Sequence, residues 1–428
     1  MELPRGSRFG GGRLGVPDEG ATDSVHFVVD RETSAHGGRA GASAYARPMR
    51  RIVTLVCIVV FADTMLFGAL VPLIPDYADD LGLSKSQAGL LLGAYGAGAL
   101  AGGIPSGFFA ARIGPRRSMV AGLLLLGATT ILFALASEAP ILGLARFGQG
   151  LASALAWTGA LSLVTLETDR ERRGELLGTI FSFAILGYIL GPMVGATAEV
   201  TSVRVTFCTV AVIAFGLAAV AARVPTTALP LRNANPVARA LTDPRFIGGL
   251  WITLLPALFF GVLEILTPLR LADAGWGAVA IASVFVVSGL LEVMTSPIVG
   301  RLSDRRGRSY PVRLALIGSI VTATAIAFAQ QPATLVPLVF LSAFTFGWFS
   351  TPGMALVADR AEKAHIPQSL AFGIMNTAWA LGAMTGPALG AALANAFSDA
   401  VPYLACAVLC AATLVVMQRL RGRPQTAP

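Results

Sequence analysis

Charged residues are scarce in this chain. They make up 13% of the 428 residues, whereas hydrophobic residues make up 55%. A soluble globular domain carries about 25% charged residues, so this chain lacks the charge to cover a water-exposed surface. The composition excludes an ordinary soluble domain and predicts a protein whose surface faces lipid. The net charge of +8 then indicates basic loops beside a membrane, not a surface for nucleic acid.

Histidine and cysteine are also rare, with three and four residues. The cysteines lie inside apolar stretches and the histidines lie outside them, so the sequence offers no set of metal ligands. We expect buried thiols, and neither a metal nor a cofactor. The sequence also shows no nucleophile–base set and no phosphate-binding loop, which argues against an enzyme.

In place of charge, the chain has long apolar runs. A membrane-spanning helix needs about 20 apolar residues. Twelve stretches approach or exceed that length: residues 52–75, 86–111, 118–137, 140–166, 175–198, 204–223, 247–270, 277–300, 311–330, 332–357, 369–395 and 401–418. The longest internal polar segment, residues 224–246, predicts a linker between two six-helix bundles, residues 49–223 and 247–418. We therefore expect an all-α integral membrane protein with twelve transmembrane helices.

The polar ends and loops predict an orientation. Residues 1–48 are rich in Gly, Arg and Ser and show no apolar periodicity. This composition predicts a disordered cytoplasmic tail and no signal peptide. Met49 leaves open a later start of the protein. Residues 419–428 form a second short tail. Lys and Arg gather in alternate loops, and this bias predicts that both termini of a multi-pass cell-membrane protein lie in the cytoplasm.

A glycine and proline pattern occurs once in each predicted half. It reads G-x8-G-x3-G-P-x2-G-A, and its central members are Gly187, Gly191, Pro192 and Gly195 in the first half and Gly382, Gly386, Pro387 and Gly390 in the second. A long repeat of this kind predicts two similar halves, which is typical of transporters. Small residues at this spacing also occur in ordinary packing of membrane helices.

Two loops form a second repeat, after the second and the eighth apolar stretch. The members that we single out are Gly107, Arg112, Gly114 and Arg116 in the first loop and Gly300, Asp304, Arg305, Gly307 and Arg308 in the second. We expect the first glycine of each to allow close helix approach and the second to allow a tight turn. The acid and the arginines can bridge helix ends in one conformation and release them in another.

These loops resemble the signature of the major facilitator superfamily, and the resemblance extends over residues 50–420. Residues 300–308 match the family pattern fully, whereas Ala111 stands where the family usually has Asp. The resemblance implies two six-helix bundles related by a pseudo-two-fold axis along the membrane normal, with the substrate site between them. Arg146 lies in a further motif that the family assigns to proton coupling. Hydrogen bonding to carbonyls near a helix end is the alternative role. The pattern around Gly191 and Pro192 resembles that of drug:proton antiporters.

Three acids, Asp63, Glu264 and Glu292, lie inside apolar stretches. A charged carboxylate facing lipid is costly, so each must face a cavity or a partner, and burial favours the neutral form. A structural hydrogen bond is the alternative for Asp63. The segment around Asp63 resembles vesicular monoamine and acetylcholine transporters, in which the matching acid recognises the amine. Glu264 resembles an acid of their seventh helix.

Aromatic residues are expected to line the same cavity, because aromatic faces attract organic cations. The candidates are Tyr95, Trp157, Tyr188, Phe346, Trp348 and Trp379, with packing or lipid contact as the alternative for each. The sequence thus predicts a monomeric, proton-coupled antiporter that exports small lipophilic or cationic compounds. A sugar or metabolite permease is the alternative within transport, and a receptor or scaffold on the same fold is the alternative outside it.

Overall fold

The computed structural model describes residues 38–168, 173–224, 242–364 and 368–421. The chain separates into residues 1–47 and a second compact unit, Pro48–Pro428. Most of the predicted tail and most of the predicted linker lie outside the described residues. Helix α1 already begins at Gly38, so residues 38–48, which we expected in a disordered tail, are helical.

All regular structure in the described residues is helical. The long helices are α1 (Gly38–Gly68), α3 (Lys85–Ile113), α4 (Pro115–Leu135), α5 (Ala139–Glu167), α6 (Arg173–Val200), α7 (Val203–Arg223), α9 (Pro244–Asp273), α10 (Ala278–Arg306), α11 (Ser309–Phe328), α12 (Pro332–Thr345), α13 (Ser350–Lys363), α14 (Gln368–Ala396) and α15 (Ala400–Arg421). Within the described ranges, 11 helices are long and apolar enough to cross a membrane. The 29-residue α14 packs among them, which gives the expected twelve.

Two of the predicted spans are broken helices. The first ends at Gly68 and continues through the short elements η1 (Val71–Leu73) and α2 (Ile74–Asp80). Pro72 lies in η1, where its missing N–H and its ring prevent an uninterrupted α-helix. The other break is η2 (Gly347–Phe349), which separates α12 from α13. Apolar length predicted both spans, but it carried no signal for the breaks.

The repeated glycine pattern packs one helix onto another in each half. A methyl carbon added at Gly191 of α6 would lie 2.9 Å from Cα of Gly68 in α1. A methyl carbon added at Gly386 of α14 would lie 3.1 Å from Cα of Gly261 in α9. Side chains at either position would therefore push backbones apart. The pattern serves helix packing in both halves.

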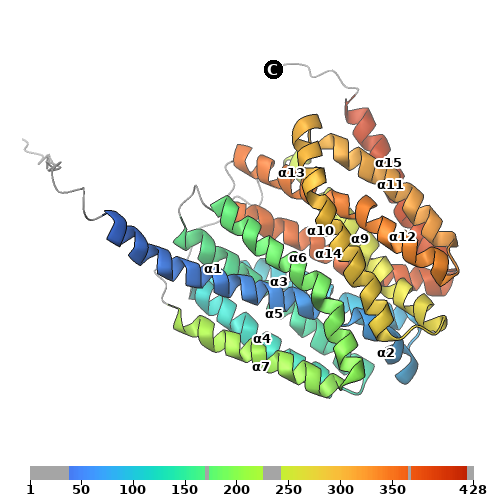
Figure 1. The fold of residues 1–428 in the computed structure, drawn as a ribbon, viewed down its shortest axis with the longest axis horizontal. Coiled ribbons are helices and arrows are strands. Elements are labelled where there is room, and N and C mark those ends of the chain that lie inside the picture. The colour runs from blue at the N-terminus through green and yellow to red at the C-terminus, as the bar shows by residue number, and fades with distance from the viewer. Residues whose placement is uncertain (1–37, 169–172, 225–241, 365–367, 422–428) are drawn as a thin grey trace, which may run out of the picture. The chain divides into compact units, whose positions relative to one another are not determined.

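The helices of the two halves form two groups in Figure 1, α3–α7 in one and α10–α15 in the other. α4 and α7 lie side by side at the outer edge of the first group, and α11 and α15 at the outer edge of the second. α3 and α14 pack against each other between the groups. Glycines of α3 allow this contact, since a methyl carbon at Gly93 would lie 2.7 Å from the carbonyl oxygen of Met384.

Candidate functional site

A cavity of about 240 Å³ lies between the two halves. It is lined by side chains from α1, α3, α5 and α6 of the first half and from α9, α10, α13 and α14 of the second. All three predicted acids, Asp63, Glu264 and Glu292, line it. No lysine, arginine or histidine is among its lining residues in the described part of the chain. The described lining of the cavity therefore concentrates carboxyl groups.

Asp63 is 1% exposed and is held by three donors from its own half. Its carboxylate accepts hydrogen bonds from Ser153 Oγ at 2.6 Å, Trp157 Nε1 at 2.8 Å and Tyr95 Oη at 3.2 Å. Ser153 and Trp157 are four residues apart on α5, so both face α1 from one side of the helix. Ser153 is not among the site residues predicted from the sequence, although its four-residue spacing from Trp157 was a signal for it.

Arg146 is fully buried beside the break in α1. Its Nη1 and Nη2 donate to the carbonyl oxygens of Leu66 and Phe67 at 3.3 and 3.1 Å, and Nη1 also donates to Gln149 Oε1 at 3.1 Å. Its guanidinium carbon lies 5.0 Å from the centre of the Tyr95 ring. A helix leaves its last carbonyls without partners, and a cation there is favourable. In this structure the arginine caps a helix end, which is one of the two roles that the sequence left open.

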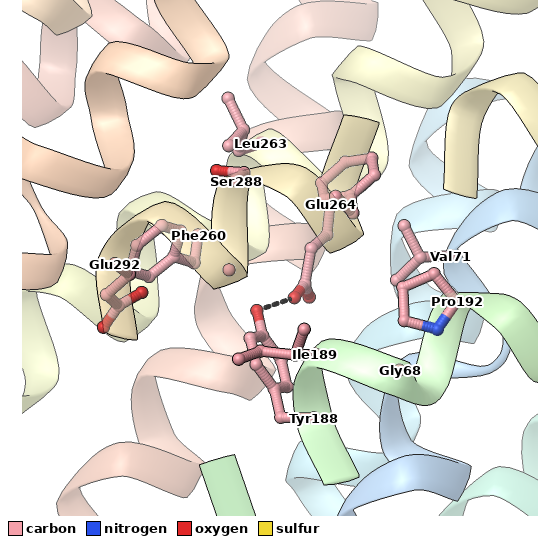
Figure 2. A pocket seen from close by; sticks show the side chains of 12 residues that line it. Gly68, Val71, Tyr188, Ile189, Pro192, Phe260, Leu263, Glu264, Ser288 and Glu292 are labelled. Atoms are coloured by element: carbon pink, nitrogen blue, oxygen red, sulfur yellow. Dashed lines mark hydrogen bonds between the residues drawn. The ribbon is translucent and has the colours of Figure 1, made fainter. Parts of the chain in front are cut away.

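Glu264 of α9 is bound by the opposite half. It is 4% exposed, and its Oε1 accepts a hydrogen bond from the Tyr188 hydroxyl of α6. Figure 2 shows the two side chains pointing toward each other, with Glu292 of α10 on the wall nearby. The contact joins α6 to α9 across the cavity, so it depends on how the two halves are placed.

Aromatic rings surround this contact. Phe67 stacks on Tyr188 with ring centres 6.0 Å apart and meets the edges of Tyr95 and Trp379 at 5.0 Å each. Four of the six predicted aromatics line the cavity: Tyr95, Trp157, Tyr188 and Trp379. Phe67, which lies at the centre of the ring cluster, was missed. Phe346 stacks on Phe259 in the core, and Trp348 Nε1 donates to Thr295 Oγ1 at 3.4 Å; neither lines the cavity.

The two repeated loops follow the C-terminal ends of α3 and α10, and we call this end of the bundle the arginine-rich end. Gly114 and Gly307 have φ angles of +94° and +80°, so the expected tight turns are present. The expected close approach at Gly107 and Gly300 is wrong, because a methyl carbon at either position would meet no atom within 4 Å. Gly107 of α3 and Gly300 of α10 therefore lie on helix surfaces that have no close neighbour at these positions.

The basic residues of these loops make contacts inside their own halves. Arg116 Nη1 donates to the carbonyl oxygen of Val224 at 2.8 Å. Arg308 lies 3.4 Å from Asp359 and 3.3 Å from Ser303 Oγ. Arg112 and Arg305 are exposed. The side chain of Asp304, expected to act as a latch, lies outside what the structure describes.

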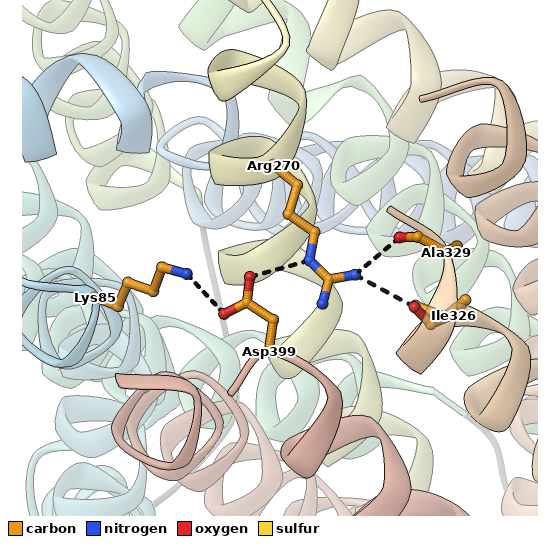
Figure 3. A network of polar contacts seen from close by, with 5 residues as sticks. All are labelled: Lys85, Arg270, Ile326, Ala329 and Asp399. Carbon is orange, nitrogen blue, oxygen red and sulfur yellow. Dashed lines mark hydrogen bonds and ion pairs between the residues drawn. The ribbon is translucent and has the colours of Figure 1, made fainter. Parts of the chain in front are cut away.

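The opposite end, which we call the Lys85 end, joins the two halves directly. Asp399, just before α15, accepts from Lys85 Nζ of α3 at 2.7 Å and from Arg270 Nε of α9 at 3.2 Å (Figure 3). Arg270 also donates to the carbonyl oxygens of Ile326 and Ala329. This network, like the packing of α3 on α14, links the two halves.

The model of the Major Facilitator Superfamily matches residues 56–368 and 257–428. The chain belongs to the major facilitator superfamily. This transporter family also accounts for the twelve helices and the cavity between two halves. Family and fold are thus those of transporters and not of enzymes, as the sequence indicated.

Named relatives of this superfamily member include drug-resistance proteins. It is 29% identical to the chloramphenicol resistance protein of Streptomyces lividans, over 86% of this chain and 95% of that protein. It is 32% identical to a protein of Danio rerio named Probable vesicular acetylcholine transporter-B, but over 39% of this chain and 36% of that protein. The chain thus spans about a third of the length of some curated relatives. Both resemblances expected from the motifs are confirmed.

Solved structures share the fold of this superfamily member. A bacterial homologue of the human lysosomal transporter Spinster, in an inward-facing and occupied conformation, superposes with a TM-score of 0.71. The match covers 88% of this chain and 98% of that chain at 15% sequence identity. At this identity the likeness supports the fold alone.

Proposed function

We propose that this superfamily member is a proton-coupled antiporter that exports small cationic, lipophilic compounds. The observation that carries the proposal is a cavity between membrane helices whose described lining holds three carboxyl groups and seven aromatic side chains and no basic residue. A carboxyl group in the membrane interior costs free energy, and such groups commonly mark ion or substrate pathways. Aromatic faces and carboxylates together favour an organic cation over a neutral sugar.

The names of the relatives support transport of small organic compounds. A chloramphenicol resistance protein is named for a small neutral compound, and a vesicular acetylcholine transporter is named for a quaternary organic cation. The matching part of the second relative is short, so the cavity chemistry carries more weight than its name.

The orientation follows from the basic loops. If both termini lie in the cytoplasm, as the concentration of Lys and Arg in alternate loops favours, the arginine-rich end faces the cytoplasm. Phe181, Thr253 and Met375 line the cavity from the parts of α6, α9 and α14 that begin at this end. At the Lys85 end the Asp399 network ties the two halves together, and we infer that this end is closed. In this conformation the cavity then accepts substrate from the cytoplasm.

The two best-defined acids suit different tasks. Asp63 is surrounded by donors, and the hydroxyls of Ser153 and Tyr95 can also accept a hydrogen bond, so this site suits both a carboxylate and a neutral acid. We assign the proton to Asp63. Glu264 has one donor from the opposite half, and we assign the substrate cation to it. Proton and cation then compete through their charges in one cavity, and this competition produces exchange.

Proton flux in proteoliposomes tests this function. Purified protein would be reconstituted with a pH-sensitive dye inside and challenged with organic cations, neutral drugs and sugars, with protein-free liposomes as the control. We expect organic cations to move protons, and sugars to have no effect. Proton movement with sugars alone would refute efflux of cations and favour a permease, and no movement with any compound would refute proton-coupled transport.

A further inference from the structure

Glu264 differs from the other well-defined acid in what binds it. Among the described residues, the one hydrogen bond to its carboxylate comes from the Tyr188 hydroxyl. Asp63 instead accepts three hydrogen bonds, from Ser153, Trp157 and Tyr95, all within its own half. A ligand that displaced those three donors would have to disrupt the packing of α3 and α5 on α1. At Glu264 a ligand meets one hydroxyl group, which donates to Oε1.

The surroundings of Glu264 suit an ammonium group. Glu264 and Glu292 line the same pocket, whose other walls include Phe260, Phe285 and Pro192 (Figure 2). Ser288 points its hydroxyl at the carbonyl oxygen of Val339, 3.3 Å away, so it is engaged elsewhere. A cation that enters here finds carboxyl groups and aromatic ring faces.

The type of cation follows from the hydrogen bond that it must replace. A primary, secondary or tertiary ammonium carries an N–H that donates to a carboxylate in a charge-assisted hydrogen bond. A quaternary ammonium carries the same charge but has no donor. If a quaternary ion displaces Tyr188, a buried carboxylate is left without a hydrogen bond, which is costly.

We propose that Tyr188 and the substrate compete for the Glu264 carboxylate, and that this carrier selects amines that bear an N–H over their quaternary analogues, because only an N–H returns a hydrogen bond to Glu264. The inference rests on the proposed transport of organic cations and names the substrate class. Tyr188 lowers the affinity for every cation, because its hydroxyl holds the place of the substrate N–H. Replacing it also breaks a contact between α6 and α9, so binding of an amine removes one link between the two halves.

Binding of a matched pair of cations tests the proposal. The probes are dimethyl(3-phenylpropyl)ammonium and trimethyl(3-phenylpropyl)ammonium, which differ by one methyl group, and calorimetric titration would be run at a pH where both are fully charged. For the wild type we expect the tertiary ammonium to bind at least about tenfold more tightly, as expected for a lost charge-assisted hydrogen bond. In Tyr188→Phe there is no hydroxyl to displace, so both cations should bind at least about threefold more tightly than to the wild type, and the ratio between them should persist.

Tyr95→Phe is the matched control, because it removes one tyrosine hydroxyl from the other acid. Neither affinity should rise in this variant, and the amine preference should persist at its wild-type ratio. Glu264→Gln should lose affinity for both cations. Equal affinity of the wild type for the two cations would overturn the proposal and leave cation transport standing, whether or not Tyr188→Phe folds. An affinity for the tertiary ammonium that does not rise in a folded Tyr188→Phe would overturn it as well. If the wild type binds neither cation, the proposed function falls and the inference falls with it.

Discussion

The two halves share a packing frame but not their chemistry. Gly68 and Gly261 occupy the same place, since each meets a glycine of the repeated pattern. Five residues before Gly68 lies Asp63, whereas five residues before Gly261 lies Pro256. Three residues after Gly261 lies Glu264, whereas the matching residue of the first half is Val71. Each half has thus placed its acid at a position that is apolar in the other half.

This difference separates a fixed site from an exchangeable one. The acid of the first half is held by donors of the same half and keeps these contacts if the halves move as rigid bodies. The acid of the second half is held by Tyr188 of the first half, so that contact must change when the halves move. The repeated helices give both halves the same packing. The two acids lie at positions that do not correspond between the halves, so the two sites differ.

The largest expected effect is the loss of Asp63. In Asp63→Asn the amide oxygen can still accept from Trp157, so the fold should survive, but the site can no longer take up a proton. We expect uptake of the tertiary ammonium into proteoliposomes, driven by a pH gradient, to fall at least about a hundredfold, or about 3 kcal/mol in the barrier. Glu292→Gln, which neutralises another acid of the same cavity, is the variant for comparison. A wild-type rate in Asp63→Asn would show that the acid of the first half is structural.

The shared frame predicts equal damage in both halves. Gly191→Ala and Gly386→Ala each place a methyl group against a neighbouring backbone, so each should lower the free energy of unfolding by about 1–3 kcal/mol. Gly178→Ala and Gly373→Ala are matched controls, because a methyl carbon there meets no atom within 4 Å. Thermal unfolding in detergent measures all four. If the controls are as damaging as the first pair, helix contact does not explain the repeat.

The smallest effect concerns the Lys85 end. Lys85→Met removes the ion pair with Asp399 that joins the halves, but the Lys85 side chain is 38% exposed, so the pair contributes about 0–1 kcal/mol. We expect a modest shift toward opening at this end, seen as faster labelling of a cysteine at Ala88, which is buried beside it. Arg306→Met at the other end should leave the labelling rate unchanged. Slower labelling in Lys85→Met would contradict a closing role.

The sequence predicted the frame well because membrane helices have strong signals. Apolar length gave twelve helices, and the glycine repeat gave two halves. The cost of Asp63, Glu264 and Glu292 in lipid predicted that they face a cavity. Ser153 and Phe67 were missed because serine and phenylalanine are ordinary in membrane helices. Their roles depend on how α1 and α5 are rotated about their axes, which packing of all the helices decides.

Proton release on binding tests most directly whether Asp63 carries the proton and Glu264 the cation. Dimethyl(3-phenylpropyl)ammonium would be added to purified protein in weakly buffered detergent solution with a pH indicator, at a pH where the amine is fully protonated. We predict that the wild type binds the amine and releases protons, that Asp63→Asn binds it without release, and that Glu264→Gln does not bind it. Unchanged proton release in Asp63→Asn, or amine binding of wild-type affinity in Glu264→Gln, would contradict this division of roles.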